Sequence, residues 1–351
     1  MSFVERVRAR AIAARRSIAF PESSDARTIG AVRTLAAQHI VRPILVLEPG
    51  DESARRVADE IGVATVRPLT DGRRARVIAH LLARRAPAGL TRDGAESLVN
   101  DPLVFADCLV ALGEVDGCVA GAAHTTADVL RAALWAVGPA RGVRIVSSAF
   151  YMVVPPFRGA GGEHEVLTFT DCAVVPRPTA SHLADIAVAA ARDRRRIVGD
   201  EPRVAFLSYS TLGSGSGASV NTVREAVALL RDPRQGETDF AVDGELQGDA
   251  ALIEAVARRK APVSTVAGRA NVLVFPSLEA GNIAYKLVER LAHAQAIGPI
   301  VQGLAHPCSD LSRGAAIDDI INVAAITALQ SLDAGPTATV LTAAPKDADG
   351  I

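Results

Sequence analysis

The chain has 351 residues, more than one ordinary hydrophobic core accommodates, so its length predicts two domains. Apolar residues make up 49% and charged residues 22%, a mixture that excludes a largely disordered protein. Basic and acidic residues nearly cancel, at 38 and 39, which argues against nucleic-acid or membrane-surface binding as the main activity.

The N-terminal sixteen residues are arginine-rich and amphipathic, which is also a feature of mitochondrial presequences. Glu5 lies inside this segment and a strand pattern follows at once, so we favour a first surface helix. The next elements expected are a strand at Ser17–Glu22, a helix at Asp25–Gln38 and a strand at Pro43–Pro49.

Strand and helix patterns continue to alternate along the chain. A helix is expected at Thr126–Val137, and a last long helix at Ala316–Leu332. The second helix carries an apolar stripe of Ile317, Ile320, Ile321, Ala324 and Ala328. Further strands are expected at Arg203–Ser210, Asn271–Ser277 and Ala296–Leu304. This alternation predicts an α/β fold around mostly parallel sheet.

The segment from Val143 to Pro176 departs from this rhythm. Two strand-like runs flank a stretch with three glycines, a pattern typical of a β-hairpin. We take the hairpin as a domain change and expect the first boundary near residue 148. From about Thr337 the tail is small and polar, and we expect it to be frayed.

The four cysteines have no paired spacing, which argues against a zinc site or a disulfide framework and favours a reducing compartment. The longest apolar runs, such as residues 145–156, are too short to span a membrane. These features predict a cytoplasmic protein.

A glycine-serine loop, Ser210–Ala218, follows one of the predicted strands. Backbone N–H groups at such a strand-to-helix turn can bind an anion, although the lysine of a P-loop and the glycine spacing of a dinucleotide site are both missing. On spacing alone, an anion site and a flexible connection fit equally well.

Three other segments carry candidate chemistry. His124 precedes a predicted helix whose start is marked by threonine hydroxyls, and Arg131 lies on that helix. A capped helix with an exposed arginine is the simpler interpretation. Asp243, Glu245 and Asp249 fall within seven positions; they would suit Mg²⁺, but the spacing is not an EF-hand and Asp249 can equally cap a helix.

The third is Ser309–Ile321. If a helix begins at Ser312, then Ser312 and Asp319 lie on one face, two turns apart. The alternative is that Ser312 is the N-cap and that the helix dipole stabilises the acidic residues of the first turn.

Together, these segments resemble the phosphate acetyltransferase (phosphotransacetylase) family over nearly the whole chain. The blocks that carry the resemblance are PESSDAR, DPLVFAD, GAAHTTADVLRAAL, RVAFLSYSTLGSG, VDGELQGDAAL, NVLVFPSLEAGNIAYKLVERL and GPIVQGLAHPCSDLSRGAAIDDI. Ser23 and Ala88 depart from the family, which often has glycine and lysine there.

The resemblance implies two three-layer α/β/α domains with a cleft between them, in an isocitrate/isopropylmalate dehydrogenase-like arrangement. Domain I would comprise residues 1–148 and 300–351, and domain II the inserted residues 149–299. The implied enzyme is a homodimer of acetate metabolism with no tightly bound cofactor and no metal. Its substrates would be coenzyme A (or acetyl-CoA), acetyl phosphate and phosphate, joined in a ternary complex without an acyl-enzyme.

The resemblance also implies roles for single residues. Asp319 would take the thiol proton of coenzyme A, Arg313 would bind the phosphate of acetyl phosphate, and Ser312 would hydrogen-bond the oxyanion. The anionic parts of the substrates would contact Arg131, Arg290, Arg85 and the loop residues Ser210, Thr211, Gly213, Ser214 and Gly215. The cluster of Asp243, Glu245 and Asp249 would then be mainly structural.

Proton transfer constrains this mechanism. A free thiol has a pKa of ~8.5 and a free aspartate ~3.9, so a separate proton transfer would be uphill by roughly 6 kcal/mol. Attack concerted with proton removal avoids a free thiolate.

Three alternatives stay open: another short-chain acyl group such as propionyl or butyryl, a metal-dependent NAD(P) hydroxyacid dehydrogenase of related fold, and a binding homologue without catalysis. The dehydrogenase would need a carboxylate metal cluster and a nucleotide signature, and the sequence has neither.

Overall fold

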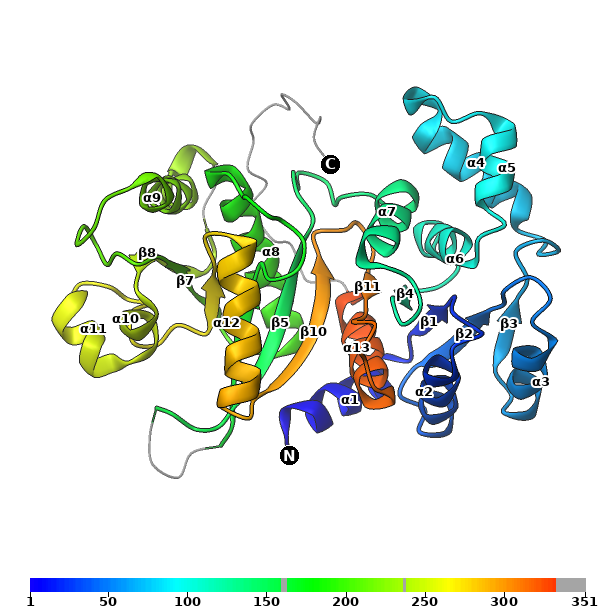
Figure 1. Ribbon diagram of the computed structural model, residues 1–351, viewed down its shortest axis with the longest axis horizontal. Helices are drawn as coiled ribbons and strands as arrows, with labels where there is room; N and C mark the ends of the chain where they lie inside the picture. Colours follow the sequence, from blue (N-terminus) through cyan, green and yellow to red (C-terminus); the bar gives the residue numbers. More distant parts are fainter. Residues whose placement is uncertain (159–162, 236–237, 333–351) are drawn as a thin grey trace.

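The computed structural model describes residues 1–158, 163–235 and 238–332, and Figure 1 shows them as two bodies side by side. Each body is built around its own sheet. The predicted frayed tail from Thr337 lies outside the described residues. Within those residues, no helix combines the length and the apolar character that a membrane crossing requires.

The first sheet has five parallel strands in the order β11-β4-β1-β2-β3. Cys308 aligns with Cys118, so a strand from late in the chain returns to lie beside β4. The strands are β1 (Ser17–Phe20), β2 (Arg42–Val46), β3 (Ala64–Val66), β4 (Gly117–Ala120) and β11 (Cys308–Asp310).

Helices cover both faces of this sheet: α1 (Phe3–Ala14), α2 (Ala26–Ala37), α3 (Glu52–Glu60), α4 (Arg74–Arg85), a 3₁₀ turn η1 (Ala86–Ala88), α5 (Arg92–Leu98), α6 (Pro102–Ala111), α7 (Thr126–Ala136) and α13 (Ile317–Gln330). Successive residues of a strand point to opposite faces. Ile18 and Phe20 of β1 therefore pack with α1, α2 and α13, whereas Ala19 packs with α4, α6 and α7.

The second sheet has six strands in the order β10-β5-β6-β9-β7-β8. They are β5 (Ser147–Val154), β6 (Glu165–Thr170), β7 (Arg203–Leu207), β8 (Ala241–Leu246), β9 (Val272–Val274) and β10 (Gln295–Gln302). β5 pairs antiparallel with both β6 and β10, and the other pairs are parallel. The predicted hairpin is thus confirmed.

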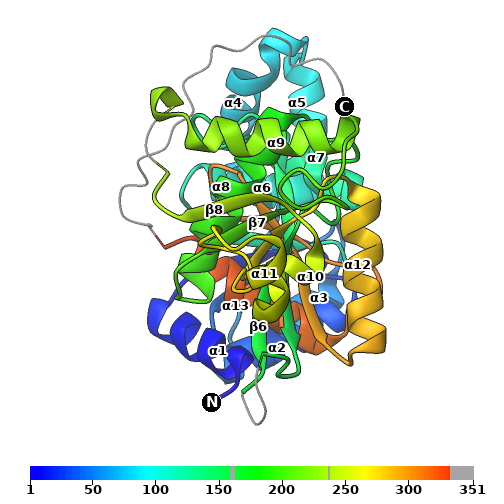
Figure 2. The ribbon, with the colours of Figure 1, turned by 90° about the vertical axis from the view of Figure 1, so that its left-hand side faces the viewer.

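The helices of the second body are α8 (Ala180–Ile197), α9 (Ala218–Arg231), a 3₁₀ turn η2 (Pro233–Gln235), α10 (Gly248–Leu252), α11 (Glu254–Lys260) and α12 (Leu278–Leu291). α8 and α9 pack in one core cluster, and α10, α11 and α12 pack in the cluster on the opposite face. Figure 2 views this body end-on, with its strands between these layers.

α13 joins the two bodies. Its residues Ile320 to Gln330 are buried, and Gln330 donates hydrogen bonds to Asp193 of α8 (2.8 Å) and to the carbonyl of Val301 (3.0 Å). At the other face, Arg8 of α1 donates to the side chain of Asn322 (3.0 Å from Nε). The predicted stripe is buried except for its first member, because Ile317 is 41% exposed.

The predicted elements agree with the observed ones except at their ends. The strands expected at 17–22, 43–49, 203–210, 271–277 and 296–304 all exist, with ends that differ by a few residues. The domain division at residues 148 and 299 stays a prediction. β5 and β10 both belong to the second sheet, and β11 and α13 return to the first body.

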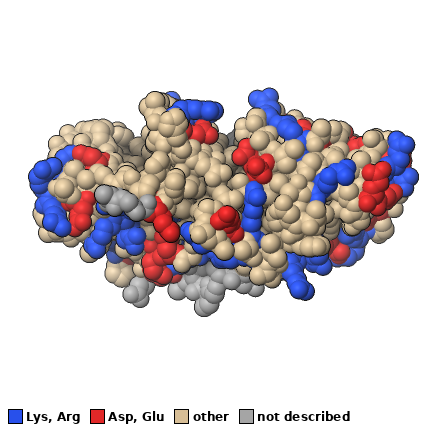
Figure 3. All heavy atoms as spheres, turned by 90° about the horizontal axis from the view of Figure 1, so that it is seen from below, with Lys and Arg blue, Asp and Glu red and all other residues tan. Residues whose placement is uncertain are grey.

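Charge is mixed on the surface. Figure 3 shows acidic and basic side chains interspersed on the lower face, in keeping with the near-zero net charge, and an outline indented between the two bodies.

Candidate active site

Three loops meet at one edge of the first sheet. They follow β1 (residues 21–25), β4 (residues 121–125) and β11 (residues 311–316). The three strands are parallel and adjacent, so their carboxyl ends lie together. In open α/β sheets, this edge is where ligands bind.

Glu22 holds the loop after β4 in place. Its Oε1 accepts hydrogen bonds from the backbone N–H groups of Gly121 (3.0 Å), Ala123 (2.8 Å) and His124 (2.9 Å), and its Oε2 from Ala122 (2.9 Å). Burial alone would raise the pKa of this carboxyl, which is 1% exposed, but the His124 ring and these N–H groups lower it below its usual value. Glu22 is therefore an ionised anchor for the loop.

Arg27, in the first turn of α2, connects the same loop to the loop after β11. Its guanidinium donates to the carbonyl of Ala122 (2.7 Å) and to the carbonyls of Arg313 (2.7 Å) and Ala315 (3.1 Å). Asp25, the N-cap of α2, pairs with the guanidinium at 2.8 Å and fixes its direction. One arginine thus sets the spacing of two loops.

Asp310 and Thr126 make a second connection between these loops. The hydroxyl of Thr126 donates to Oδ2 of Asp310 at 2.7 Å. Asp310 is 1% exposed, and burial raises its pKa to about 6 although the Thr126 hydroxyl and the Leu311 N–H lower it.

The predicted catalytic residues lie beside these anchors. Ser312, Arg313 and Asp319 are all exposed. Ser312 accepts a hydrogen bond from the N–H of Gly314 (3.2 Å), and Asp319 accepts one from the N–H of Ala316 (2.9 Å). In the described part of the chain, the guanidinium of Arg313 has no ion-pair partner.

The condition for Ser312 and Asp319 to share a helical face, a helix that begins at Ser312, is not met, and Ser312 is not the N-cap either. α13 begins at Ile317 with Ala316 as its N-cap, so Ser312 is neither helical nor the cap. Ala316 has no side-chain acceptor, and Asp319 instead bonds the N-cap N–H from within the first turn. Ser312 and Asp319 still belong to one continuous loop and helix start.

The predicted substrate arginines lie on three helices. Arg131, exposed on α7, pairs with Asp128 one turn earlier. Arg85, at the end of α4, stacks over the ring of Trp135 at 5.2 Å, one turn beyond Arg131 on α7. Arg290 is exposed on α12 in the second body, with Glu289 at 3.8 Å.

The glycine-serine loop is built on a buried carboxylate. Glu245 accepts hydrogen bonds from the Ser210 hydroxyl (2.8 Å), the Gly213 N–H (2.9 Å) and the Arg224 guanidinium (2.8 Å). Burial would raise the pKa of Glu245, but these three donors lower it to about 2.

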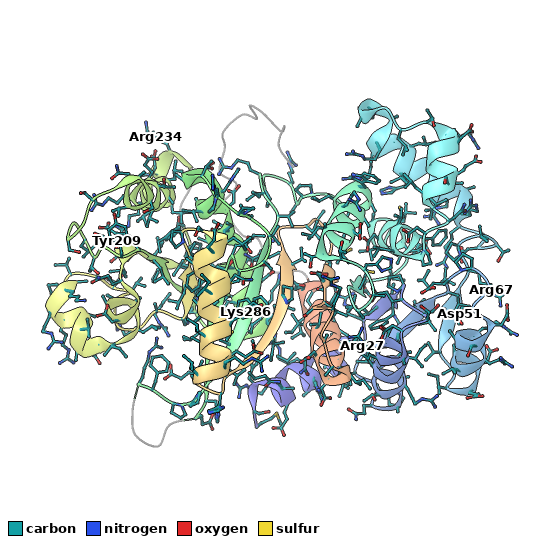
Figure 4. The ribbon with its side chains drawn as sticks, viewed as in Figure 1. Arg27, Asp51, Arg67, Tyr209, Arg234 and Lys286 are labelled. Atoms are coloured by element: carbon teal, nitrogen blue, oxygen red, sulfur yellow. The ribbon has the colours of Figure 1, made fainter. Side chains whose placement is uncertain are left out.

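Two further hydrogen bonds lie within the loop. The Gly215 N–H donates to Ser210 (2.8 Å) and the Thr211 N–H to Ser214 (2.9 Å). The N–H groups that we expected to receive an anion are therefore already bonded at these positions. Figure 4 shows Tyr209, which precedes the loop, in the second body and Arg27 in the first.

The three carboxylates considered for Mg²⁺ each have a separate basic partner. Asp243 pairs with Arg231 (2.7 Å), Glu245 with Arg224 (2.8 Å) and Asp249 with Lys260 (2.9 Å). Asp249 does not cap α10, because the N-cap is Gln247. Among the residues that the structure describes, no group of three or more histidine, cysteine or acidic side chains is placed to hold a metal ion.

Four anchors of the site were not assigned from the sequence: Glu22, Arg27, Thr126 and Asp310. Each lies at the end of a strand, just after one, or in the first turn of the next helix, and that position was the available signal. Their pairing depends on strand order, which spacing along the chain does not give.

These features define an α/β protein whose candidate site lies at the carboxyl ends of parallel strands. The sequence profile of the family described as Phosphate acetyl/butaryl transferase matches residues 2–328. A phosphate acetyltransferase of Treponema pallidum is 41% identical over 338 residues, which cover 94% of this chain and 99% of that protein. The chain therefore belongs to the phosphate acetyl/butyryl transferase family, and it is an acyltransferase.

Solved structures agree with this assignment. A phosphotransacetylase from Staphylococcus aureus aligns with a TM-score of 0.83 at 37% identity, over 94% of this chain and 98% of that one. A putative 4-hydroxythreonine-4-phosphate dehydrogenase from Salmonella typhimurium aligns with a TM-score of 0.52 at 12% identity, over 90% and 99% of the two chains. The latter likeness is one of fold alone, and it supports the dehydrogenase-like arrangement that the resemblance implied.

Proposed function

We propose that this protein transfers an acetyl group reversibly between acetyl phosphate and coenzyme A. The observation that carries the proposal is the exposed set of Ser312, Arg313 and Asp319 on a loop that Arg27 holds against the loop after β4. Membership of the family and the name of the Treponema pallidum relative support acetyl as the transferred group.

In this mechanism the thiol sulfur of coenzyme A attacks the carbonyl carbon of acetyl phosphate. Asp319 takes the thiol proton as the sulfur–carbon bond forms. The tetrahedral intermediate then collapses, the bond from the carbonyl carbon to the bridging oxygen breaks, and phosphate leaves with that electron pair. No acyl-enzyme forms, and both substrates are bound together.

Two neighbouring residues stabilise the charge that develops. Arg313 has a guanidinium without an ion-pair partner in the described chain, and its planar donor pair matches phosphate oxygens. The Ser312 hydroxyl accepts from Gly314, so its own proton is available for the oxyanion. Because the sulfur attacks while Asp319 removes the proton, no free thiolate forms, and the exposed Asp319 does not have to deprotonate the thiol in a separate step.

The remaining substrate contacts are assigned to arginines and to the glycine-serine loop. Arg131 lies on α7, and Arg85 of α4 stacks over Trp135, one turn further along α7. We assign both guanidinium groups to the phosphates of coenzyme A. Arg290 and the loop of Ser210, Thr211, Gly213, Ser214 and Gly215 would contribute from the second body. Because the N–H groups of Gly213 and Gly215 are already bonded to Glu245 and Ser210, the loop would contribute a fixed shape more than free donors.

The proposal includes a cytoplasmic homodimer with no resident cofactor. Large apolar side chains are exposed on the second body, a kind of surface that oligomers bury: Ile253, Val263, Ile283, Leu287 and Leu291. Light scattering on the purified protein would give twice the 36.5 kDa chain mass for a dimer.

Initial velocities test the reaction. The protein is assayed with coenzyme A and acetyl phosphate in the presence of a chelator, varying both substrates. A ternary complex gives intersecting reciprocal plots, whereas parallel plots would indicate an acyl-enzyme. Propionyl and butyryl phosphates are compared in the same assay; one methylene changes kcat/KM by only about 10- to 200-fold, so acetyl should be preferred but not exclusive.

A further inference from the structure

The imidazole of His124 is held by one nitrogen only. Its Nδ1 lies 2.9 Å from Oε1 of Glu22, the same oxygen that accepts the backbone N–H of His124. Because Glu22 is an ionised acceptor with four backbone donors around it, Nδ1 must carry the proton and donate it. The orientation of the ring is therefore fixed, and Nε2 is the nitrogen that stays available to a ligand.

Nε2 of His124 has no hydrogen-bond partner within the described part of the chain, and the side chain is 31% exposed. The residue belongs to the loop that Arg27 bonds through Ala122 and that Thr126 joins to Asp310. Through those contacts it lies at the same sheet edge as Arg313. A donor at Nε2 would thus face solvent beside the loop proposed to bind phosphate.

From this geometry we propose that His124 is a substrate-contacting residue, whose Nε2–H donates a hydrogen bond to an oxygen of the phosphoryl group of acetyl phosphate, or of inorganic phosphate in the reverse direction. The inference rests on the proposed function and deepens it by adding a second cation to the phosphate site. Glu22 is then a positioning residue, which orients the ring and favours its charged form.

The protonation state decides whether this contact exists. Since Nδ1–H donates to Glu22, Nε2 bears a proton only in the imidazolium, and in the neutral ring it would be an acceptor that repels phosphate oxygens. The hydrogen bond to Glu22 raises the pKa of His124 against the opposing effect of burial. Contact with phosphate is therefore present at low pH and lost as pH rises through that pKa.

Other charged groups near the ring have partners of their own. Asp101, which precedes α6, accepts the N–H of Leu103 (2.8 Å), and Asp128 of α7 pairs with Arg131. Both act with Glu22 to favour the imidazolium. The guanidinium of Arg27 also contacts this loop, at the carbonyl of Ala122, and it is already paired with Asp25. An incoming phosphate would meet the ring at Nε2.

The test compares His124→Gln with His182→Gln, a control at the start of α8 in the second body. In His124→Gln we expect KM for acetyl phosphate and for phosphate to rise about 10- to 100-fold, the loss of one charge-assisted hydrogen bond, with KM for coenzyme A nearly unchanged. His182→Gln should match the wild type. A His124→Gln enzyme with unaltered phosphate KM would overturn the proposal.

The pH profile separates contact from loop support. At each pH the ratio of phosphate KM values, variant to wild type, cancels the ionisation of the substrate. The ratio should be largest at low pH and fall towards 1 above the pKa of His124. A ratio independent of pH would mean that His124 only supports the loop.

A binding readout keeps the inference independent of turnover. Inorganic phosphate is titrated into the wild-type protein while the imidazole signals are followed by NMR, with His124→Gln identifying its resonance. We expect phosphate to shift that resonance and to raise its pKa. If the wild type binds phosphate at His124 but forms no thioester, the proposed function fails and this site stands; if turnover is normal and the resonance does not respond, the site fails alone.

Discussion

The hydroxyl of Thr126, the first residue of α7, donates a 2.7 Å hydrogen bond to Asp310, the last residue of β11. These residues lie 184 positions apart, yet they fix the loop after β4 against the loop that carries Ser312 and Arg313. Together with Arg27 and Glu22, they hold in place the loops that follow neighbouring strands. The positions of the exposed candidate residues therefore depend on side chains that are largely buried.

Gly121 is required at this junction. A Cβ there would lie 2.5 Å from Oδ1 of Asp310 and 2.6 Å from the N of Leu311, and φ is +112°. Gly113 is the matched control, because its φ is +71° and a Cβ there would meet no atom within 4 Å. We expect Gly113→Ala to cost about 1 kcal/mol of unfolding free energy from backbone strain alone. Gly121→Ala should cost about 2 kcal/mol more and lower kcat, measured by urea unfolding and assay. Equal costs would contradict this account.

Glu245 supports the glycine-serine loop from below. Glu245→Gln removes the charge that Arg224, the Gly213 N–H and Ser210 all face, and should lower the unfolding free energy by about 2 kcal/mol. Glu254→Gln, in an exposed pair with Arg258, is the control and should change little.

The sign of the pH effect follows from the Glu245 pKa of about 2. Stability from this group is present above its ordinary pKa of 4.5 and is lost as pH falls through about 2. The difference in unfolding free energy between wild type and Glu245→Gln should therefore shrink over that window. A constant difference would show that the ion pair is not responsible.

The carboxyl of Asp107 should make the free energy of unfolding depend on pH with the opposite sign. This carboxyl is 1% exposed beneath β4 and β11; burial raises its pKa to about 7, although the thiols of Cys308 and Cys118 lower it. The folded state then disfavours the ionised form, so this group lowers stability progressively as pH rises from about 4 to 7. Relative to the wild type, Asp107→Asn should become more stable over that range, by an amount on the order of a few kcal/mol. Chemical unfolding at several pH values measures it; parallel curves would refute the expectation.

Arg313 is expected to act on phosphate and not on the fold. Its guanidinium has no ion-pair partner in the described chain, so Arg313→Gln should leave Tm nearly unchanged. KM for acetyl phosphate should rise about 10- to 100-fold, because a charge-assisted contact is lost. Arg259→Gln, at an exposed position of α11, serves as control. A large drop in Tm for Arg313→Gln would instead make it structural.

The alternation of strands and helices was sufficient to predict an α/β fold with mostly parallel sheet and the hairpin, whereas β3, β8 and β11 were not predicted. Ile18 and Phe20 face one side of the first sheet and Ala19 the other, but all three are apolar and buried, so the sequence predicts the strand and not which side each residue faces. The start of the last helix was predicted to within one residue, at Ala316, but its capping was not: Asp319 bonds the N–H of Ala316, an N-cap that has no side-chain acceptor of its own.

The supports of the site were not predictable from spacing. Glu22 binds a loop about 100 residues away, and the partner of the Gly213 N–H is Glu245, 32 residues on. Such pairs are determined by the order of the strands in the sheet, and local sequence propensity carries no information on strand order. The candidate catalytic set was assigned by family resemblance, since the seven-residue separation of Ser312 and Asp319 fits a catalytic pair and a capped helix equally well.

The most direct test of the account is thioester formation by the wild type and by Asp319→Asn, with Asp318→Asn as the neighbouring control. Both carboxylates lie in the first turn of α13, and an asparagine at 319 can still accept the Ala316 N–H. The account predicts acetyl-CoA from acetyl phosphate and coenzyme A with chelator present. It also predicts a loss of about 10²- to 10⁴-fold in kcat for Asp319→Asn only. Equal turnover by Asp319→Asn and the wild type would contradict Asp319 as the base, and no thioester from the folded wild type would contradict the reaction itself.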